Sequence, residues 1–171
     1  MKGMRGFFEN FLERESLFLD KTSLLSHYVP NEVLYREELI NEIANILAPS
    51  LRIERPSNLF VYGKTGTGKT LSIRYILQSM DQISKERNIP LKSIYINCKL
   101  KRVADTEYRL IAQIIKSFGR DIPATGLPTD EVYNIFYRLL DSEKQIILLV
   151  LDEIDQLTKK MGDEILYNLT R

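Results

Sequence analysis

Apolar and polar residues follow two different rhythms along this chain of 171 residues, and each rhythm predicts a type of element. Three short runs are apolar enough for buried strands: residues 58–62, 93–97 and 145–151. Elsewhere apolar residues recur every three or four positions, which predicts amphipathic helices over 32–47, 69–80 or beyond, 106–118 and 129–140. Thr106 is expected to cap the helix over 106–118, and Thr129 the helix over 129–140. A final helix is expected within 154–171, broken near Met161 and Gly162.

Strands that alternate with helices favour an α/β fold of three layers, in which a parallel sheet lies between helices. Residues 146–151 are all apolar, so the third strand is expected to be buried on both faces. The first residues, 1–27, are expected to form a separate helix or arm. One side of this segment is apolar with helical spacing, formed by Phe7, Phe8, Phe11 and Leu12. Packing of this side on a core is favoured over binding to a partner. Residues 28–171 then form the α/β domain.

Composition narrows the class of protein without identifying it. Charged residues make up 27% and hydrophobic residues 44% of the chain, as in ordinary globular domains, and the net charge of +1 argues neither for nor against DNA. The single cysteine, Cys98, excludes a disulfide within the chain and is interpreted as a buried thiol at a strand end. The longest apolar run is too short to span a bilayer and no signal peptide is recognisable, so we expect an intracellular protein without a membrane partner.

A glycine-rich loop follows the first predicted strand and precedes a predicted helix. It matches the P-loop pattern G-x-x-x-x-G-K-[ST], which binds phosphate in that context: Gly63, Lys64, Thr65, Gly66, Thr67, Gly68, Lys69 and Thr70. Glycines let backbone N–H groups wrap a phosphate, and the N-terminus of the following helix attracts the same anion. A flexible glycine turn is the alternative, and the agreement of strand, loop and helix argues against it.

The residues that end this loop have separate expected roles. Lys69 supplies positive charge to the β- and γ-phosphates and is a candidate catalytic residue. Thr70 offers its hydroxyl to Mg²⁺, and Leu71 is included among the nucleotide contacts.

Two adjacent carboxylates end the third predicted strand, Asp152 and Glu153. Ligands bind at the carboxyl ends of strands in open α/β sheets, so both are expected beside the P-loop. Asp152 would hold Mg²⁺ through water, and Glu153 would polarise the water that attacks the γ-phosphate. An acidic surface turn is the alternative. The pair is typical of the ATPase branch that includes AAA+ proteins.

Three separated segments resemble archaeal replication initiators, the AAA+ homologues of origin recognition complex subunit one and cell division control protein six. Residues 28–39 resemble the box that precedes the P-loop in this family, YVPNEVLYREEL. Residues 58–70 resemble its Walker A region, NLFVYGKTGTGKT, and residues 150–157 its Walker B region, VLDEIDQL. The first box carries most of the family specificity, because many ATPases share the other two.

The resemblance implies an ATP-binding DNA replication initiator that recognises origin DNA and helps to load the replicative helicase, in the cytoplasm and on the chromosome. In the family, the segment matching 28–36 lies against adenine and ribose. Tyr28 and Val29 would therefore form an apolar wall for ATP or ADP, and Arg36 a polar contact. The alternatives are core packing for Tyr28 and Val29 and a surface ion pair for Arg36. Two segments are weaker candidates for DNA contact: 123–132, and the basic cluster Lys99, Lys101 and Arg102, for which a solvated turn is favoured.

The resemblance covers only the N-terminal portion of such an initiator. The family's sensor residues, arginine finger and winged-helix domain have no counterpart before Arg171, and neither has the strand that belongs between 58–62 and 145–151. We therefore expect a fragment or truncated reading frame with an incomplete AAA+ core. It should hydrolyse ATP weakly or not at all and associate with itself through exposed sheet edges. The alternative functions are another AAA+ ATPase, such as a clamp-loader subunit or transposition helper, and a non-catalytic nucleotide-binding module.

Overall fold

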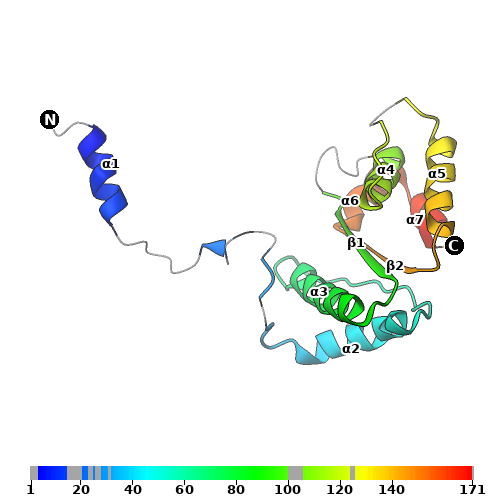
Figure 1. Ribbon diagram of the computed structural model, residues 1–171, viewed down its shortest axis with the longest axis horizontal. Coiled ribbons are helices and arrows are strands. Elements are labelled where there is room, and N and C mark those ends of the chain that lie inside the picture. Colours follow the sequence, from blue (N-terminus) through cyan, green and yellow to red (C-terminus); the bar gives the residue numbers. More distant parts are fainter. Residues whose placement is uncertain are drawn as a thin grey trace. The chain divides into compact units, whose positions relative to one another are not determined.

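The computed structural model describes residues 4–14, 21–22, 25, 28–30, 32–99, 106–123 and 126–170. The chain divides into two compact units, Met1–Glu32 and Val33–Arg171. The first unit contains helix α1 (Met4–Glu13) (Figure 1), and no residue of this helix is buried. Its aromatic residues Phe7, Phe8 and Phe11 are all exposed, so the core packing expected for this helix is absent within its own unit.

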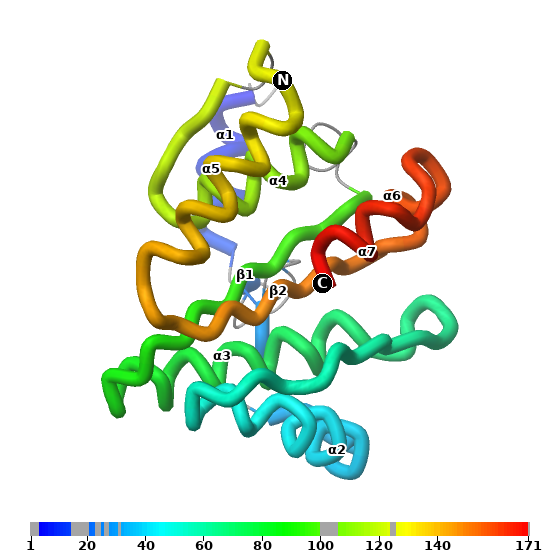
Figure 2. Tube along the Cα trace, turned by 90° about the vertical axis from the view of Figure 1, so that its right-hand side faces the viewer, coloured from blue at the N-terminus to red at the C-terminus, as the bar shows by residue number. Residues whose placement is uncertain are grey.

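The second unit has the three-layer α/β arrangement that the sequence predicts, with two parallel strands in its sheet. Strand β1 (Leu91–Asn97) pairs with strand β2 (Ile146–Asp152), in a register that runs from Leu91 opposite Ile146 to Asn97 opposite Asp152. Helices α2 (Glu37–Leu47) and α3 (Lys69–Arg87) lie on one side of the sheet, with the short helix η2 (Ala48–Arg52) after α2. On the other side lie α4 (Glu107–Ser117), α5 (Thr129–Asp141), α6 (Ile154–Met161) and α7 (Glu164–Thr170) (Figures 1 and 2).

Alternate residues of β2 serve two hydrophobic cores, which explains its continuous apolar run. Ile146, Leu148 and Val150 belong to the core shared with α2 and α3. The intervening residues pack on the core shared with α4 to α7: Ile147, Leu149 and Leu151. Successive side chains of a strand point to opposite faces, so helices on both faces require apolar residues at every position. The expectation that this strand is covered on both faces is confirmed.

The strand expected over 58–62 is absent, which corrects the sequence prediction. The sheet of the described residues has two strands, and the second edge of β2 has no strand partner there. Val61 packs on the α2–α3 core, whereas Phe60 and Tyr62 are 72% and 83% exposed. An apolar run becomes a strand only when a neighbouring strand accepts its backbone hydrogen bonds, and among the described residues no strand pairs with this segment.

Helix boundaries differ from the predictions at two N-termini. Helix α2 begins at Glu37 rather than near residue 32, because Tyr35 has a left-handed backbone with φ of 61° that cannot continue a right-handed helix. Thr106 caps α4 as expected, its hydroxyl accepting a hydrogen bond of 3.3 Å from the backbone N–H of Arg109. Thr129 does not cap α5. Pro128 occupies that position, and its fixed φ of −58° leads directly into the helix.

Cys98 is buried directly after β1, as the sequence predicts. Its backbone N–H donates to the carbonyl of Asp152 over 2.8 Å, which extends the contact between the strand ends. Burial, and then the negative charge of Asp152, raise the pKa of the Cys98 thiol to about 11. Among the described residues, no helix combines the length and apolar character needed to cross a membrane.

Candidate phosphate- and metal-binding site

The glycine-rich loop has the backbone that its glycines permit. Gly63, Gly66 and Gly68 have φ of 151°, 80° and 80°, in the left-handed region that favours glycine. Thr67 closes the turn, because its hydroxyl donates to the carbonyl of Lys64 over 2.8 Å. Helix α3 then begins at Lys69, so its N-terminal N–H groups open directly onto the loop. A helix N-terminus that opens onto such a loop is suited to an anion.

Lys69 reaches back across the loop that precedes it. Its ammonium group donates to the carbonyl of Gly63 over 2.8 Å and to that of Lys64 over 2.9 Å. The positive charge therefore sits within the span of the loop. A phosphate bound there would offer this ammonium an anionic acceptor, which forms a stronger hydrogen bond than a neutral carbonyl does.

The structure joins the loop helix to the end of β2, as expected from the order of the motifs. The hydroxyl of Thr70 donates to Oδ2 of Asp152 over 2.8 Å. The other carboxylate oxygen of Asp152 accepts from the backbone N–H of Glu153 over 3.0 Å. The loop preceding α3 and the start of α6 accordingly lie at the same end of the sheet (Figure 2).

Glu153 stands at the N-terminus of α6 in a conformation that is costly for its residue type. Its φ of 55° and ψ of 39° are left-handed, and its side chain makes no cap hydrogen bond to α6. A non-glycine residue held there costs roughly 1–3 kcal/mol, and such residues concentrate at functional sites. The side chain is exposed, beside the fixed carboxylate of Asp152.

A tyrosine that motif matching misses completes the cluster. The hydroxyl of Tyr95, on β1, donates to Oδ2 of Asp152 over 2.5 Å. The guanidinium carbon of Arg74, on α3, lies 4.3 Å from the centre of the Tyr95 ring. Burial raises the pKa of the Tyr95 hydroxyl, and the hydrogen bond to Asp152 and its charge raise it further, so the proton stays on the tyrosine.

The sequence did contain a signal for Tyr95. Along β1, polar and hydroxyl-bearing residues alternate with Ile94 and Ile96, which belong to the α4–α7 core. The alternate face therefore looks toward α3. Ser93 on this face donates to Asp81 of α3 over 2.5 Å. Tyr95 lies two residues further along the same face, so its hydroxyl is expected near the end of α3 that follows the loop.

Arg36 lies beside the loop, although its expected partner is the adenine or ribose. A methyl group added at Gly68 would lie 3.0 Å from Nε of Arg36 and 3.2 Å from its Cζ. The guanidinium therefore packs against the turn that starts α3. Leu71 is partly exposed in the first turn of that helix. Tyr28 and Val29 belong to the first unit, and their contacts with a nucleotide stay predictions.

The oxygen atoms at this site fit Mg²⁺ that arrives with a nucleotide. Thr70 and Asp152 bring a hydroxyl and a carboxylate oxygen within 2.8 Å of each other. Within the described ranges, no group of three or more His, Cys, Asp and Glu side chains is arranged to hold a metal. Mg²⁺ prefers oxygen ligands and is commonly held by one or two protein groups, waters and the phosphates of its substrate. The set present here matches that pattern.

The candidate DNA-contacting segments are only partly within the described residues. Lys99 is exposed after β1, while Lys101 and Arg102 lie outside the described residues. The second segment, 123–132, comprises a loop and the first turn of α5. Two residues of this loop, 124 and 125, lie outside the described residues. Acidic residues occupy that turn, Asp130 and Glu131, so it offers no basic surface to a phosphate backbone.

Comparison with known proteins gives consistent matches. Residues 52–171 match the model of the family described as AAA domain. An ORC1-type DNA replication protein of Thermococcus onnurineus is 45% identical over 168 residues, which cover 96% of this chain and 40% of that protein. An ORC1-type DNA replication protein 1 of Methanosarcina mazei is 44% identical over 170 residues, covering 99% of this chain and 40% of that protein. The chain thus spans about two fifths of the length of these curated relatives.

Solved structures agree with the sequence matches. The Aeropyrum pernix ORC1 protein in complex with DNA has a TM-score of 0.79 and 40% identity, covering 86% of this chain and 38% of that one. The Aeropyrum pernix ORC2 protein, in ADPNP–ADP complexes, has a TM-score of 0.72 and 23% identity, covering 91% and 41%, and supports the fold alone. The resemblance to replication initiators stated from the sequence is confirmed by these matches.

Proposed function

We propose that this chain, which belongs to the AAA domain family, binds ATP or ADP with Mg²⁺ at the loop 63–70, as part of a DNA replication initiator. The observation that carries the proposal is the hydrogen bond of 2.8 Å between Thr70 and Asp152, at the mouth of a loop with P-loop geometry. A loop that bound only an inorganic anion would have no need for a carboxylate beside it, since that carboxylate would repel the anion. A carboxylate and a hydroxyl together suit a cation that accompanies phosphate.

Each residue has a task in binding. Backbone N–H groups of the loop and the first turn of α3 receive the phosphates. Lys69 adds a positive charge, and its ammonium group gives up only its hydrogen bonds to the carbonyls of Gly63 and Lys64 when it binds a phosphate. Thr70 and Asp152 would hold the cation, which when bound neutralises charge that develops on the phosphates. Arg36, against Gly68, adds a second positive charge beside the loop. Tyr28, Val29 and Leu71 are proposed to contact the base and sugar.

Hydrolysis requires a group that orients water, and Glu153 is proposed for this role. It is exposed and follows directly after Asp152. A Glu153→Gln variant keeps the shape of the side chain and removes its basicity. It should leave nucleotide affinity within about twofold of wild type and lower turnover about 100-fold or more, in the range of general-base effects. If this chain turns over no ATP while it binds nucleotide, the alternative of a non-catalytic nucleotide-binding module is favoured.

The wider role proposed for the whole protein is origin recognition and helicase loading. Relatives are named ORC1-type DNA replication proteins, and one solved relative is in complex with DNA. A clamp-loader-like or transposition-helper ATPase is the alternative role, and the names of the relatives disfavour it. Fluorescence anisotropy with an origin duplex and a scrambled duplex, at about 50 and about 200 mM salt, separates the two. Preference for the origin at the higher salt supports an initiator, and equal weak binding supports a general ATPase.

Thermal unfolding tests the nucleotide site itself. Mg²⁺–ATP at 100 times its dissociation constant should stabilise the folded chain by about 2.7 kcal/mol and raise its melting temperature. Lys69→Ala, which is expected to bind at least about 10-fold more weakly, should lose about half of this stabilisation or more at the same ligand concentration. Lys85→Ala, at the exposed far end of the same helix, is the matched control and should keep it. An equal shift in Lys69→Ala and wild type would reject the proposed site.

A further inference from the structure

We propose that Tyr95 is a positioning residue, which holds the Asp152 carboxylate in the orientation that a nucleotide-bound cation requires, and that Arg74 in turn holds Tyr95. This inference rests on the proposed binding of Mg²⁺–nucleotide at the loop 63–70. It assigns a role to a side chain of β1 that lies outside both sequence motifs.

Three donors from three elements fix the carboxylate of Asp152. Oδ2 accepts from Thr70 on α3 over 2.8 Å and from Tyr95 on β1 over 2.5 Å. Oδ1 accepts from the backbone N–H of Glu153, at the start of α6, over 3.0 Å. Each donor restrains rotation of the carboxylate about the Cβ–Cγ bond of Asp152. The orientation of Asp152 is therefore set by its neighbours rather than left to its own torsional preference.

Tyr95 differs from the other side-chain donor in one respect. Thr70 is itself a proposed ligand of the cation, so its hydroxyl has two tasks. The Tyr95 hydroxyl lies on the adjacent strand, where Tyr95 is opposite Val150 in the register and Asp152 follows two residues later. It donates to Asp152 from outside the proposed ligand set. Ligating carboxylates are commonly oriented by such outer hydrogen bonds, and losing one typically costs metal affinity.

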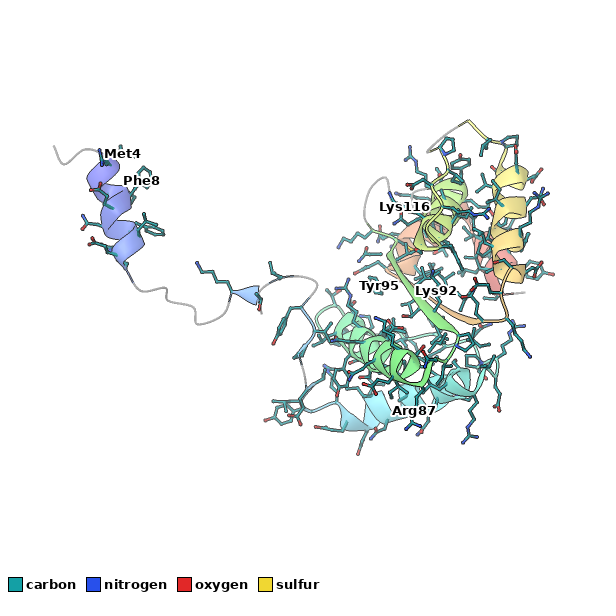
Figure 3. The ribbon with its side chains drawn as sticks, viewed as in Figure 1. Met4, Phe8, Arg87, Lys92, Tyr95 and Lys116 are labelled. Carbon is teal, nitrogen blue, oxygen red and sulfur yellow. The ribbon has the colours of Figure 1, made fainter. Side chains whose placement is uncertain are left out.

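Arg74 limits the movement of the tyrosine ring. Its guanidinium carbon lies 4.3 Å from the ring centre, within the range of a cation–π contact. Arg74 lies one helical turn after Thr70 on α3, so the same helix presents one donor to Asp152 and braces the other. Tyr95 lies on β1 close to this helix (Figure 3). The contact ties the ring to the element that carries the phosphate loop.

The test compares nucleotide affinity with and without Mg²⁺, measured with a fluorescent (methylanthraniloyl) ADP. The readout is the Mg²⁺-dependent gain, meaning the affinity in Mg²⁺ divided by the affinity in EDTA. Tyr95→Phe keeps the ring and removes the donor. We expect its gain to fall about 10-fold while its affinity in EDTA stays within about twofold of wild type. Arg74→Gln should lower the gain by a smaller factor, and Arg74→Lys, which keeps a cation over the ring, should restore part of it.

Tyr137→Phe is the matched control, because it removes an exposed tyrosine hydroxyl from α5, on the other side of the sheet. Its gain should equal that of wild type. An unchanged gain in Tyr95→Phe, or an equal loss of affinity in EDTA and in Mg²⁺, would overturn the inference while leaving nucleotide binding intact. Failure of wild type to bind the nucleotide would instead reject the proposed function. If Tyr95→Phe melts well below wild type, the Arg74 variants decide, and an unchanged gain in Arg74→Gln overturns the inference.

Discussion

The hydroxyl of Thr70 donates to the carboxylate of Asp152 over 2.8 Å, which links two motifs 82 residues apart in the sequence. Thr70 begins the helix after the phosphate loop, and Asp152 ends a strand that contributes to both cores. The link brings an anion-binding helix terminus and a carboxylate to one end of the sheet. The proposed function depends on this arrangement, in which the oxygen atoms of Thr70 and Asp152 lie beside the phosphate-binding loop 63–70.

Asp152→Asn should remove most of the Mg²⁺ dependence of nucleotide binding. The amide keeps an oxygen for the hydroxyl donors but loses the charge that Mg²⁺ requires. We expect the Mg²⁺-dependent gain in affinity to fall about 10-fold or more, measured by calorimetric titration in Mg²⁺ and in EDTA. Asp163→Asn, on the exposed turn between α6 and α7, is the control and should change neither value. A full gain in Asp152→Asn would contradict the assignment.

Glu153→Gly should stabilise the fold while it removes the proposed catalytic group. Glycine adopts the left-handed conformation of this residue, with φ of 55°, without the steric cost that a β-carbon brings. We expect the free energy of unfolding to rise by about 1 kcal/mol in urea titrations, whereas Glu153→Gln should leave it unchanged. A lower stability in Glu153→Gly would mean that the glutamate side chain makes a stabilising contact that outweighs its backbone strain.

Stability should fall at high pH through the thiol of Cys98. Its pKa is about 11 in the folded chain against an ordinary value of 9.0, because of burial first and the charge of Asp152 second. Above pH 9.0 the unfolded thiol ionises while the folded one does not, so ionisation favours the unfolded state until pH reaches about 11. The loss should be about 2 kcal/mol relative to its value below pH 9.0.

Urea unfolding of wild type and Cys98→Ala across this pH range isolates the contribution of the thiol. Other groups titrate there as well, but they are common to both proteins. The difference in unfolding free energy between the two should shrink or reverse as pH rises. A difference that stays constant would show that Cys98 does not titrate between these values.

The exposed aromatic pair Phe60 and Tyr62 should promote self-association. The rings of Phe60 and Tyr62 stack with centres 6.1 Å apart and are largely exposed. Sedimentation velocity should show a species that grows with protein concentration, and Phe60→Ser with Tyr62→Ser should weaken it. Leu34→Ser removes an apolar side chain that is 59% exposed elsewhere, and serves as the control. Wild type that stays monomeric at all concentrations would contradict this prediction.

Local signals in the sequence predicted the elements whose pattern repeats over a few residues. The helical stripes, the two paired strands and the glycine turns all depend on short-range spacing. The segment 58–62 failed because a strand depends on a neighbour, which no local pattern reports. Phe60 and Val61 look alike in a hydrophobic run, yet one is exposed and the other packs on a core.

The candidate site was likewise predictable only in part. The loop and the two carboxylates are motif residues, and their proximity follows from the rule that ligands lie at strand ends. Tyr95 belongs to no motif, and the box that contains Arg36 implied a contact with adenine or ribose rather than with the loop. Tyr95 reaches Asp152 across the strand register, and Arg36 reaches Gly68 from the start of another helix, so both contacts depend on tertiary geometry.

Calorimetric titration of the chain with ATP in Mg²⁺ tests the central claim most directly. Wild type and Lys85→Ala should bind one nucleotide per chain with the same dissociation constant. Lys69→Ala should bind at least about 10-fold more weakly, because the phosphates lose their nearest ammonium group. No heat of binding for wild type, or equal affinity for wild type and Lys69→Ala, would contradict the account of the loop as a nucleotide site.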